Sequence, residues 1–235
     1  MLQKLLTHAV ISLLVASACL PAYGKEPQQA QVFYHNYDPT EFENYRTYEL
    51  DLILLALEKT VPTFGPYEMQ AVGVEVAINQ ARSIALIKKH NYPNYVRSFG
   101  FQPSLTEAHD LHLVPFPLYL GAMSYRVCFT SKKIAKDVAR VKTVEELKKF
   151  RFGTGIGWSD ASILRHNGVK VTEINTYDSL FKMTAINRSV DLFCRGSGEV
   201  ELEAKRHKDM EGLVLDRSIA LYYLQPLFLY MNKAD

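Results

Sequence analysis

The chain has 235 residues, of which 48% are apolar and 22% are charged, and its formal net charge is +2. This composition is typical of a packed globular protein. It shows neither the basic excess of a nucleic-acid-binding protein nor a block of like charges, so we expect no nucleic-acid partner. The length fits one large domain or two small lobes.

The first 24 residues have the layout of a secretory signal peptide. Lys4 provides a positive start, residues 9–20 form an apolar run, and Ala22-Tyr23-Gly24 is a small-x-small cleavage site. The run is shorter than the ~20 apolar residues that a membrane-spanning helix needs. We therefore expect export and a periplasmic location. Cys19 leaves a lipid-anchored form as the less favoured alternative.

The first half of the chain alternates strand and helix signals. Hydrophobic periodicity predicts strands at 31–35, 67–73 and 95–99 and helices at 45–59 and 76–89. Val61-Pro62 and Gly65-Pro66 are expected to stop the first helix. This β-α-β-α-β order is typical of a mostly parallel sheet flanked by helices.

The second half repeats the alternation after an irregular stretch at 102–118. Thr143 and Glu146 form a capping box, and Gly168 is placed to end a helix in the left-handed conformation. Strands are predicted at 125–130, 152–156, 169–174, 190–194, 213–216 and 221–231, and helices after Thr143 and at 159–167, 179–187 and 199–208.

A glycine-rich segment at 153–157 follows a predicted strand and opens a helix. Its G-x-G-x-G spacing is neither a dinucleotide fingerprint nor a Walker loop, so no cofactor is expected. Trp158, Ser159 and Asp160 come next, at the carboxyl end of a strand, where open α/β sheets bind ligands. Free backbone amides at this helix start could act as donors. The alternative is that Ser159 or Asp160 only caps the helix and Trp158 packs on the sheet.

Arg195 is expected in the equivalent loop after the strand at 190–194, where its guanidinium could hold a carboxylate. The alternative is an ion pair with Glu199 or Asp191. His109 and His112 are three residues apart, but no further ligands accompany them and we expect no metal site. Catalytic signatures such as G-x-S-x-G and H-E-x-x-H are absent from the sequence, so we do not expect an enzyme.

Cys128 and Cys194 are the two cysteines outside the predicted signal peptide. In an oxidising compartment such a pair can close a disulfide. The alternative is two buried thiols on neighbouring strands.

Several segments of the chain, in the order in which they occur, resemble segments of the periplasmic solute-binding proteins that serve polar amino-acid transporters. These binding proteins are known as family 3. Residues 142–147 followed by 152–155 resemble the family's entry into its second lobe, and residues 177–193 resemble its later helix–strand segment. The run from Gly155 to Gly168 is similar to a G-x-G-W-x-D-x-x-I-L-R-x-N-G loop in uncharacterised extracytoplasmic relatives.

The resemblance implies a two-lobed α/β fold of the type II periplasmic-binding-protein kind, with a mostly parallel, helix-flanked sheet in each lobe. Lobe 1 would comprise 25–115 plus 220–235 and lobe 2 would comprise 121–214. Two extended hinge crossovers are expected near 115–124 and 215–224. The family normally ends with a helix after the second crossover, and its absence up to Asp235 leaves open that the chain is a fragment.

The resemblance also implies a small polar solute, such as an amino acid, bound between the lobes of a monomer that serves a membrane permease. The expected ligand-binding residues are Tyr34, Arg82, Ser104, Thr106, Glu107, Trp158, Ser159, Asp160 and Arg195. In the family an Arg follows the Glu of the first-lobe motif and clamps the ligand's carboxylate, whereas here Ala108 follows Glu107. Arg82 or Arg195 would have to supply that charge. The alternative function is a sensory or interaction protein with the same fold and a degenerate pocket.

Overall fold

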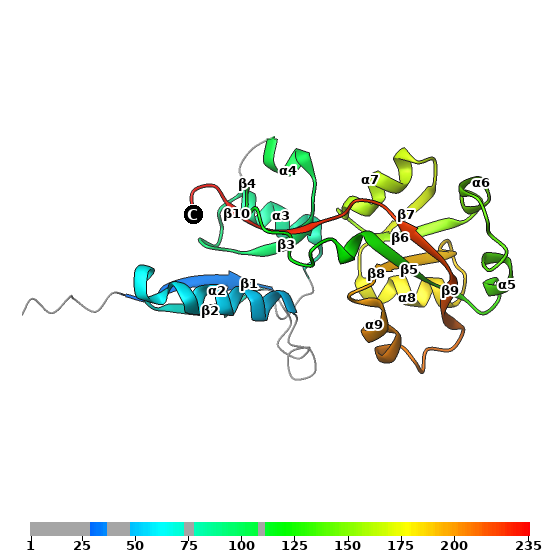
Figure 1. The fold of residues 1–235 in the computed structure, drawn as a ribbon, viewed down its shortest axis with the longest axis horizontal. Helices are drawn as coiled ribbons and strands as arrows, with labels where there is room; N and C mark the ends of the chain where they lie inside the picture. Colours follow the sequence, from blue (N-terminus) through cyan, green and yellow to red (C-terminus); the bar gives the residue numbers. More distant parts are fainter. Residues whose placement is uncertain (1–28, 37–47, 73–77, 108–110) are drawn as a thin grey trace, which may run out of the picture.

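The computed structural model describes residues 29–36, 48–72, 78–107 and 111–235, which form two lobes joined by two chain crossovers (Figure 1). The first lobe holds both the start and the end of the described chain, and the second lobe is one continuous segment. The predicted signal peptide lies outside the described residues. Within the described ranges, no helix is long and apolar enough to cross a membrane.

The first lobe contains two small sheets and their covering helices. Its strands are β1 (Gln31–His35), β2 (Tyr67–Ala71), β3 (Arg97–Gly100), β4 (Leu111–Leu113) and β10 (Leu227–Asn232), and its helices are α2 (Tyr48–Phe64), α3 (Gln80–Lys88) and α4 (Pro103–Glu107). β1 and β2 are parallel, whereas β10 lies between β3 and β4 and is antiparallel to both. A single parallel bridge between Tyr34 and Tyr95 links the two sheets.

The second lobe is built on one five-stranded sheet. Its strands are β5 (Tyr125–Ser131), β6 (Arg151–Gly155), β7 (Lys170–Ile174), β8 (Leu192–Gly196) and β9 (Leu213–Tyr222), and its helices are η1 (Ala122–Ser124), α5 (Ala135–Val138), α6 (Val144–Leu147), α7 (Ser159–His166), α8 (Tyr177–Ala185) and α9 (Val200–Arg206). The strand order is β7-β6-β8-β5-β9, in which β6 runs parallel to β7 and β8, and β5 runs antiparallel to β8 and β9. The expected two-lobed α/β fold is confirmed.

Strand alternation decides which face of this sheet each central side chain occupies. Phe193 of β8 packs in the core cluster on one face, and Cys194 packs in the cluster on the other. Because strand side chains alternate, Arg195 shares the face of Phe193. On the neighbouring β5, Arg126 shares the face of Cys128, which belongs to the same cluster as Cys194. The two arginines therefore leave opposite faces of the sheet.

The two cysteines lie opposite each other on β5 and β8 and are joined as a disulfide, with an S–S distance of 1.91 Å. The bond links strands near the centre of the second-lobe sheet. Because both ends lie in the same lobe, it does not restrain the crossovers.

Two local motifs that the sequence predicts are confirmed. The Thr143 hydroxyl accepts a hydrogen bond from the Glu146 amide at 3.2 Å, and the Glu146 carboxylate accepts one from the Thr143 amide at 3.3 Å. Gly168 has φ 77° directly after α7, the left-handed conformation that glycine adopts without a steric penalty.

Of the two predicted stops of the first helix, Val61-Pro62 is wrong, because α2 continues to Phe64, and Gly65-Pro66 is confirmed. A proline in the last turn removes only one backbone donor, and the helix tolerates the loss there. The helix ends instead at Gly65, which has φ 88° and donates its amide to the Val61 carbonyl at 2.9 Å.

Several strand boundaries also differ from the predicted ones, and two of these differences matter for the candidate site. The strand predicted at 190–194 is observed as Leu192–Gly196, so Arg195 lies inside β8 and not in the loop after it. β9 extends to Tyr222 within the second-lobe sheet, so the second crossover consists of residues 223–226.

Candidate functional site

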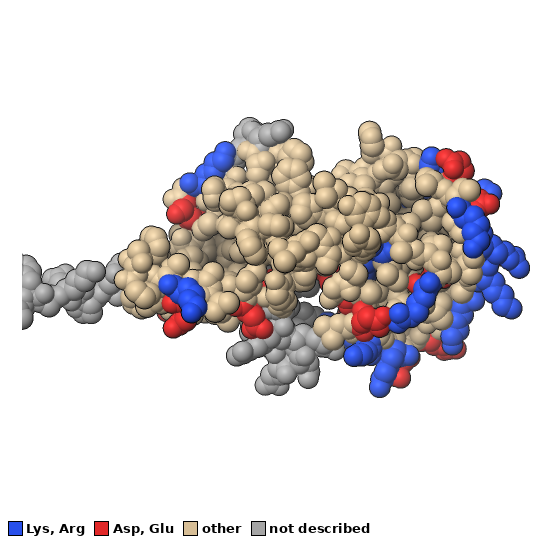
Figure 2. Space-filling view, in the orientation of Figure 1, with Lys and Arg blue, Asp and Glu red and all other residues tan. Residues whose placement is uncertain are grey.

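A cavity of about 700 Å³ lies between the two lobes. Side chains of both lobes line it, together with Tyr119 in the first crossover (residues 114–121), Met123 just after that crossover and Gln225 in the second. Figure 2 shows acidic and basic atoms around the hollow between the lobes. The site therefore combines hinge residues with two facing walls.

One charged cluster in the second-lobe wall centres on Arg195, which is 9% exposed. Its guanidinium lies 2.8 Å from a carboxylate oxygen of Glu199 and 2.9 Å from one of Glu203, both contributed by α9 or the residue before it. Tyr177 donates its phenol hydrogen to Glu203. The sequence alternative of an ion pair with Glu199 is confirmed, and Glu203 is an additional partner.

Aromatic rings enclose the same guanidinium. The Arg195 Cζ atom lies 4.9 Å from the centroid of the Trp158 ring and 5.4 Å from that of Tyr177. Trp158 also packs on Phe193 with ring centroids 6.2 Å apart. Cation–π contacts of this kind hold an arginine in one orientation. Trp158 therefore both packs on the sheet and lines the cavity.

Burial and neighbouring charges shift the pKa values of the acidic groups in this cluster. Burial raises the pKa of Glu199 to about 7, because the lowering by Arg195 is offset by the neighbouring Glu203 carboxylate. Burial also raises the pKa of the Tyr177 phenol well above its ordinary value. At neutral pH, the Glu199 carboxyl therefore titrates while Tyr177 stays protonated.

A second buried cluster lies on the opposite face of the sheet and involves the second crossover. Arg126 is 3.2 Å from the Asp160 carboxylate. That carboxylate also accepts hydrogen bonds from the Tyr223 phenol at 2.6 Å and from the Gln225 side chain at 2.9 Å. Gln225 donates to Ser159 as well. Arg126 and Asp160 are 3% and 6% exposed, and both line the cavity.

The first-lobe wall presents an acid at the start of α2. Glu49 is buried, and its carboxylate accepts hydrogen bonds from Ser98 at 2.5 Å and from Tyr119 at 3.2 Å. Tyr119 also packs against Tyr48, with ring centroids 5.0 Å apart. Two hydroxyl donors from β3 and the first crossover thus fix Glu49 at the edge of the cavity.

Direct hydrogen bonds join the lobes beside the cavity. Asn79 donates to the Asn175 side chain at 2.6 Å, and Gln80 donates to the Gly157 carbonyl at 2.8 Å. Gly157 has φ 85°, and a Cβ added there would lie 3.0 Å from the backbone nitrogen of Ala81. This glycine therefore permits the close approach of α3 to the glycine-rich loop.

The four expected second-lobe residues, Trp158, Ser159, Asp160 and Arg195, all line the cavity. Neither Ser159 nor Asp160 makes a side-chain cap, because Trp158 occupies the N-cap position of α7. The expected backbone donors in the loop are partly used within the protein: Trp158 donates its amide to the Gly155 carbonyl, and Gly157 donates its amide to Glu173.

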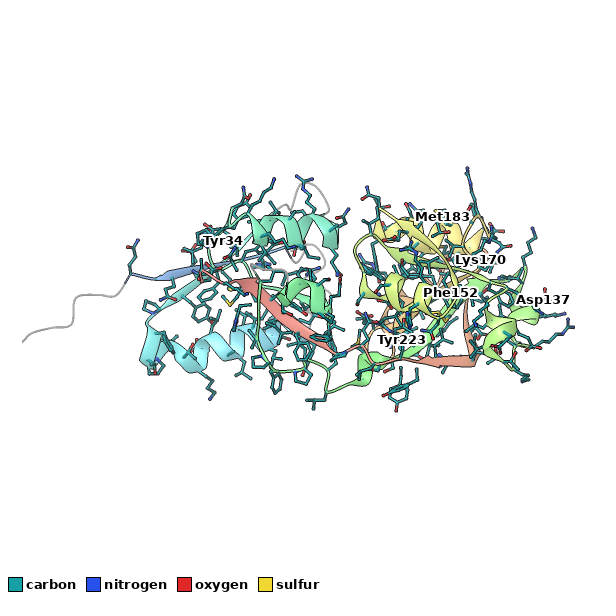
Figure 3. All side chains as sticks on the ribbon, turned by 90° about the horizontal axis from the view of Figure 1, so that it is seen from above. Tyr34, Asp137, Phe152, Lys170, Met183 and Tyr223 are labelled. Carbon is teal, nitrogen blue, oxygen red and sulfur yellow. A yellow bond between two sulfur atoms is a disulfide. The ribbon has the colours of Figure 1, made fainter. Side chains whose placement is uncertain are left out.

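Four of the expected first-lobe residues, Tyr34, Arg82, Ser104 and Thr106, do not lie among the described side chains that line the cavity. Tyr34 packs against Tyr92 in the first-lobe core, and Figure 3 places it away from the second lobe. Arg82 and Ser104 are exposed, and Thr106 donates to the Pro103 carbonyl within α4. The Glu107 side chain lies outside the described part of the structure, as do Ala108 and His109.

Two charged residues of the cavity lining that the sequence did not predict are Arg126 and Glu49. For Arg126 and Glu49 a signal was present: Arg126 interrupts an apolar strand, and Glu49 interrupts the apolar stripe of a helix. Gln225 and Tyr119 carried no such signal, because only the meeting of the two crossovers places them there. Among the described residues, no group of three or more His, Cys, Asp or Glu side chains could hold a metal ion.

Comparison with known proteins identifies the fold. No family model and no curated protein matches the chain. Among solved structures, an arginine-specific periplasmic binding protein from Salmonella typhimurium has a TM-score of 0.62 and 12% identity, with coverage of 88% of this chain and 87% of that one.

Two further solved structures are similar. A mutant of the arginine-binding protein from T. maritima has a TM-score of 0.60 and 15% identity, covering 88% of this chain and 82% of that one. The periplasmic VFT2 domain of BvgS from Bordetella pertussis has a TM-score of 0.60 and 12% identity, covering 88% and 83%. At these identities the likeness shows a two-lobed periplasmic-binding-protein fold.

Proposed function

We propose that this protein is an exported, non-enzymatic binding protein that captures a small polar solute between its lobes and delivers it to a membrane permease. The observation that carries the proposal is the interlobe cavity of about 700 Å³, which both lobes and both crossovers line. Sites for small molecules are concave and of this size, with a few fixed polar groups among aromatic side chains. The periplasmic location rests on residues 1–24 of the sequence.

The arrangement of the walls supports capture by lobe closure. Trp158 and Asp160 come from one lobe, Glu49 from the other, and Gln225 from a crossover. A solute that contacts all of them is fully surrounded only when the lobes are together. Binding then favours the closed arrangement by the difference in affinity between closed and open states. We expect the protein to act as a monomer.

The test is a metabolite screen by thermal unfolding, with small-angle scattering for every hit. A solute that binds between the lobes should raise the melting temperature and reduce the radius of gyration. Mass spectrometry of the denatured protein would identify a solute that co-purifies. A broad library that changes neither the melting temperature nor the radius of gyration would contradict the proposal.

A matched pair of variants locates the binding site. Trp158→Ala removes a ring from the cavity wall and should weaken binding about tenfold. Tyr34→Ala removes a half-buried ring that packs in the first lobe, away from the cavity, and should leave the affinity unchanged. Equal effects of the two variants would place the solute elsewhere.

A sensory role with the same fold is the second candidate, and the direct interlobe hydrogen bonds favour it. Because Asn79 and Gln80 reach the second lobe themselves, protein contacts contribute to closure alongside any solute. In this case a membrane partner would recognise the arrangement of the lobes. Trp158→Ala would then weaken solute binding and leave partner binding intact, whereas a transport protein would deliver less solute.

A further inference from the structure

The second-lobe sheet has one edge that lies away from the cavity. Strand pairing brings the end of β5 next to the starts of β8 and β9, and the start of β6 next to those of β7 and β8. The cavity is lined at the opposite edge, where β6 and β8 end in Gly155 and Gly196. We call the edge that holds residues 131, 151, 170, 192 and 213, with the connecting segment 132–149, the distal edge.

The segment that covers the distal edge is strongly basic. Residues 132–149 contain α5 and α6, and they include seven Lys and Arg but three Asp and Glu. Figure 2 shows Lys and Arg side chains gathered at this end of the second lobe. Figure 3 places Asp137 of α5 at the opposite end of the molecule from Tyr34 of the first lobe. The basic charge therefore concentrates at one end of the protein.

The three acids of the segment are each engaged within it. Asp137 pairs with Arg140 at 3.3 Å. Glu145 pairs with Lys148 at 3.7 Å, and Glu146 forms the capping box of α6. The other lysines of the distal edge are exposed and form no ion pair with any described residue. They are Lys132, Lys133, Lys136, Lys142, Lys149 and Lys170.

Two further exposed acids lie beside the segment and do not cancel its charge. Asp209 and Glu211 precede β9, next to Lys132, whose amide donates to the Gly212 carbonyl at 2.8 Å. The exposed Lys208 accompanies them. The distal edge thus keeps a basic excess when these neighbours are included.

The residue types at the distal edge fit a lipid surface better than a folded protein. Surfaces that bind proteins are depleted of lysine and enriched in aromatic residues. Here six of the seven basic residues in 132–149 are lysine, and the segment contains no aromatic residue. Lysine clusters attract anionic lipid head groups through charge, without a fixed shape on the partner.

We propose that the distal edge docks the protein on an anionic phospholipid surface, with its exposed lysines among the head groups. The inference goes beyond the proposed function, because it does not depend on the solute. It uses the predicted export, which brings the chain to a membrane. Docking there holds the second lobe and leaves the cavity clear, so the first lobe can still move.

The experiment is vesicle flotation of the exported protein. One set of vesicles is phosphatidylcholine alone, and the other contains about 30% phosphatidylglycerol, which supplies the anionic charge that lysines recognise. We expect binding to the anionic vesicles only. Raising NaCl from about 0.02 M to about 0.5 M should release the protein, because the screening length falls from about 20 Å to about 4 Å.

Two triple variants remove the same charge from different places. The first changes Lys132, Lys133 and Lys136 of the distal edge to Gln. The second changes three exposed lysines of the first lobe to Gln: Lys59, Lys88 and Lys89. A lysine near an anionic surface contributes about fivefold in affinity, so the distal-edge variant should bind at least tenfold more weakly. The first-lobe variant should bind as the unaltered protein does, and neither should change the melting temperature.

Three results would overturn the inference. The first is equal binding to both kinds of vesicle or to neither, and the second is an equal loss of affinity in the two variants. The third is binding to native membranes that protease treatment of those membranes abolishes, without binding to vesicles of their extracted lipids, because a protein partner would then occupy the distal edge. The metabolite screen decides the proposed function separately from these results.

Discussion

Gly157 provides a direct test of whether the two lobes close as the structure describes. Its backbone has φ 85°, and an added Cβ would meet the Ala81 backbone of the first lobe at 3.0 to 3.2 Å. Gly157→Ala therefore has two effects. It costs about 1 kcal/mol or slightly more because a side chain disfavours the left-handed conformation. It also forces the lobes apart by a few tenths of an ångström.

The second effect weakens the hydrogen bonds that the Gly157 carbonyl accepts from Gln80 at 2.8 Å and Gln102 at 3.3 Å. At about 1 kcal/mol for each bond, losing both would shift the closed-to-open ratio by roughly tenfold or more. We expect a larger radius of gyration by small-angle scattering and weaker binding of any solute that the closed cavity holds.

Gly168→Ala is the matched control. Gly168 has φ 77°, so it carries the same backbone cost, but an added Cβ would meet only the flexible Lys148 side chain at 3.4 Å. Both variants should lose a few degrees of melting temperature. Only Gly157→Ala should change the radius of gyration. If both variants scatter like the unaltered protein, α3 does not restrain the glycine-rich loop as we infer.

Three further predictions concern the second lobe. Replacing Cys128 and Cys194 with serine should lower the free energy of unfolding by about 4 kcal/mol, because the disulfide closes a loop of 66 residues. Urea unfolding with and without reductant measures this change. An unchanged free energy of unfolding would contradict the disulfide. Since the pKa of Glu199 is raised to about 7, its contribution to stability is present below pH 4.5 and is lost as pH rises to 7. The free energy of unfolding of Glu199→Gln should therefore not fall over this pH range as that of the unaltered protein does. Parallel pH profiles of the two proteins would contradict the raised pKa. Burial raises the pKa of Asp191, but hydrogen bonding to Arg151 outweighs it and holds the pKa below its ordinary value. Asp191→Asn should therefore lower the free energy of unfolding by about 1 to 3 kcal/mol above pH 4. The difference from the unaltered protein should vanish as pH falls through that lowered pKa.

The second-lobe wall could be predicted from the sequence because its residues follow a rule of local order. Trp158, Ser159 and Asp160 come directly after a strand that ends in glycines, and ligands bind at the carboxyl ends of such strands. The same rule led to Arg195, although that residue lies inside its strand and not after it. Its place in the cavity lining was predicted correctly, but its pairing with two glutamates depends on where α9 packs.

The first-lobe wall could not be predicted in this way, because tertiary packing decides it. Thr106 and Ser104 belong to a segment that matched the family by position, yet they do not line the cavity. Glu49 does so from the start of a long helix, where an acid is also expected simply because it favours the helix N-terminus. The two interpretations of Glu49 become distinguishable only once Ser98 and Tyr119 are seen to donate to it.

Gln225 connects the second crossover to the candidate site through its hydrogen bonds. Its backbone amide donates to the Ser124 hydroxyl beside the first crossover at 3.0 Å, while its side chain donates to Asp160 in the cavity lining at 2.9 Å. A bound molecule that competes for Asp160 would loosen the very segment about which the lobes rotate. The time that a molecule stays bound should therefore depend on how firmly Gln225 holds Asp160, as well as on the contacts that the molecule itself makes.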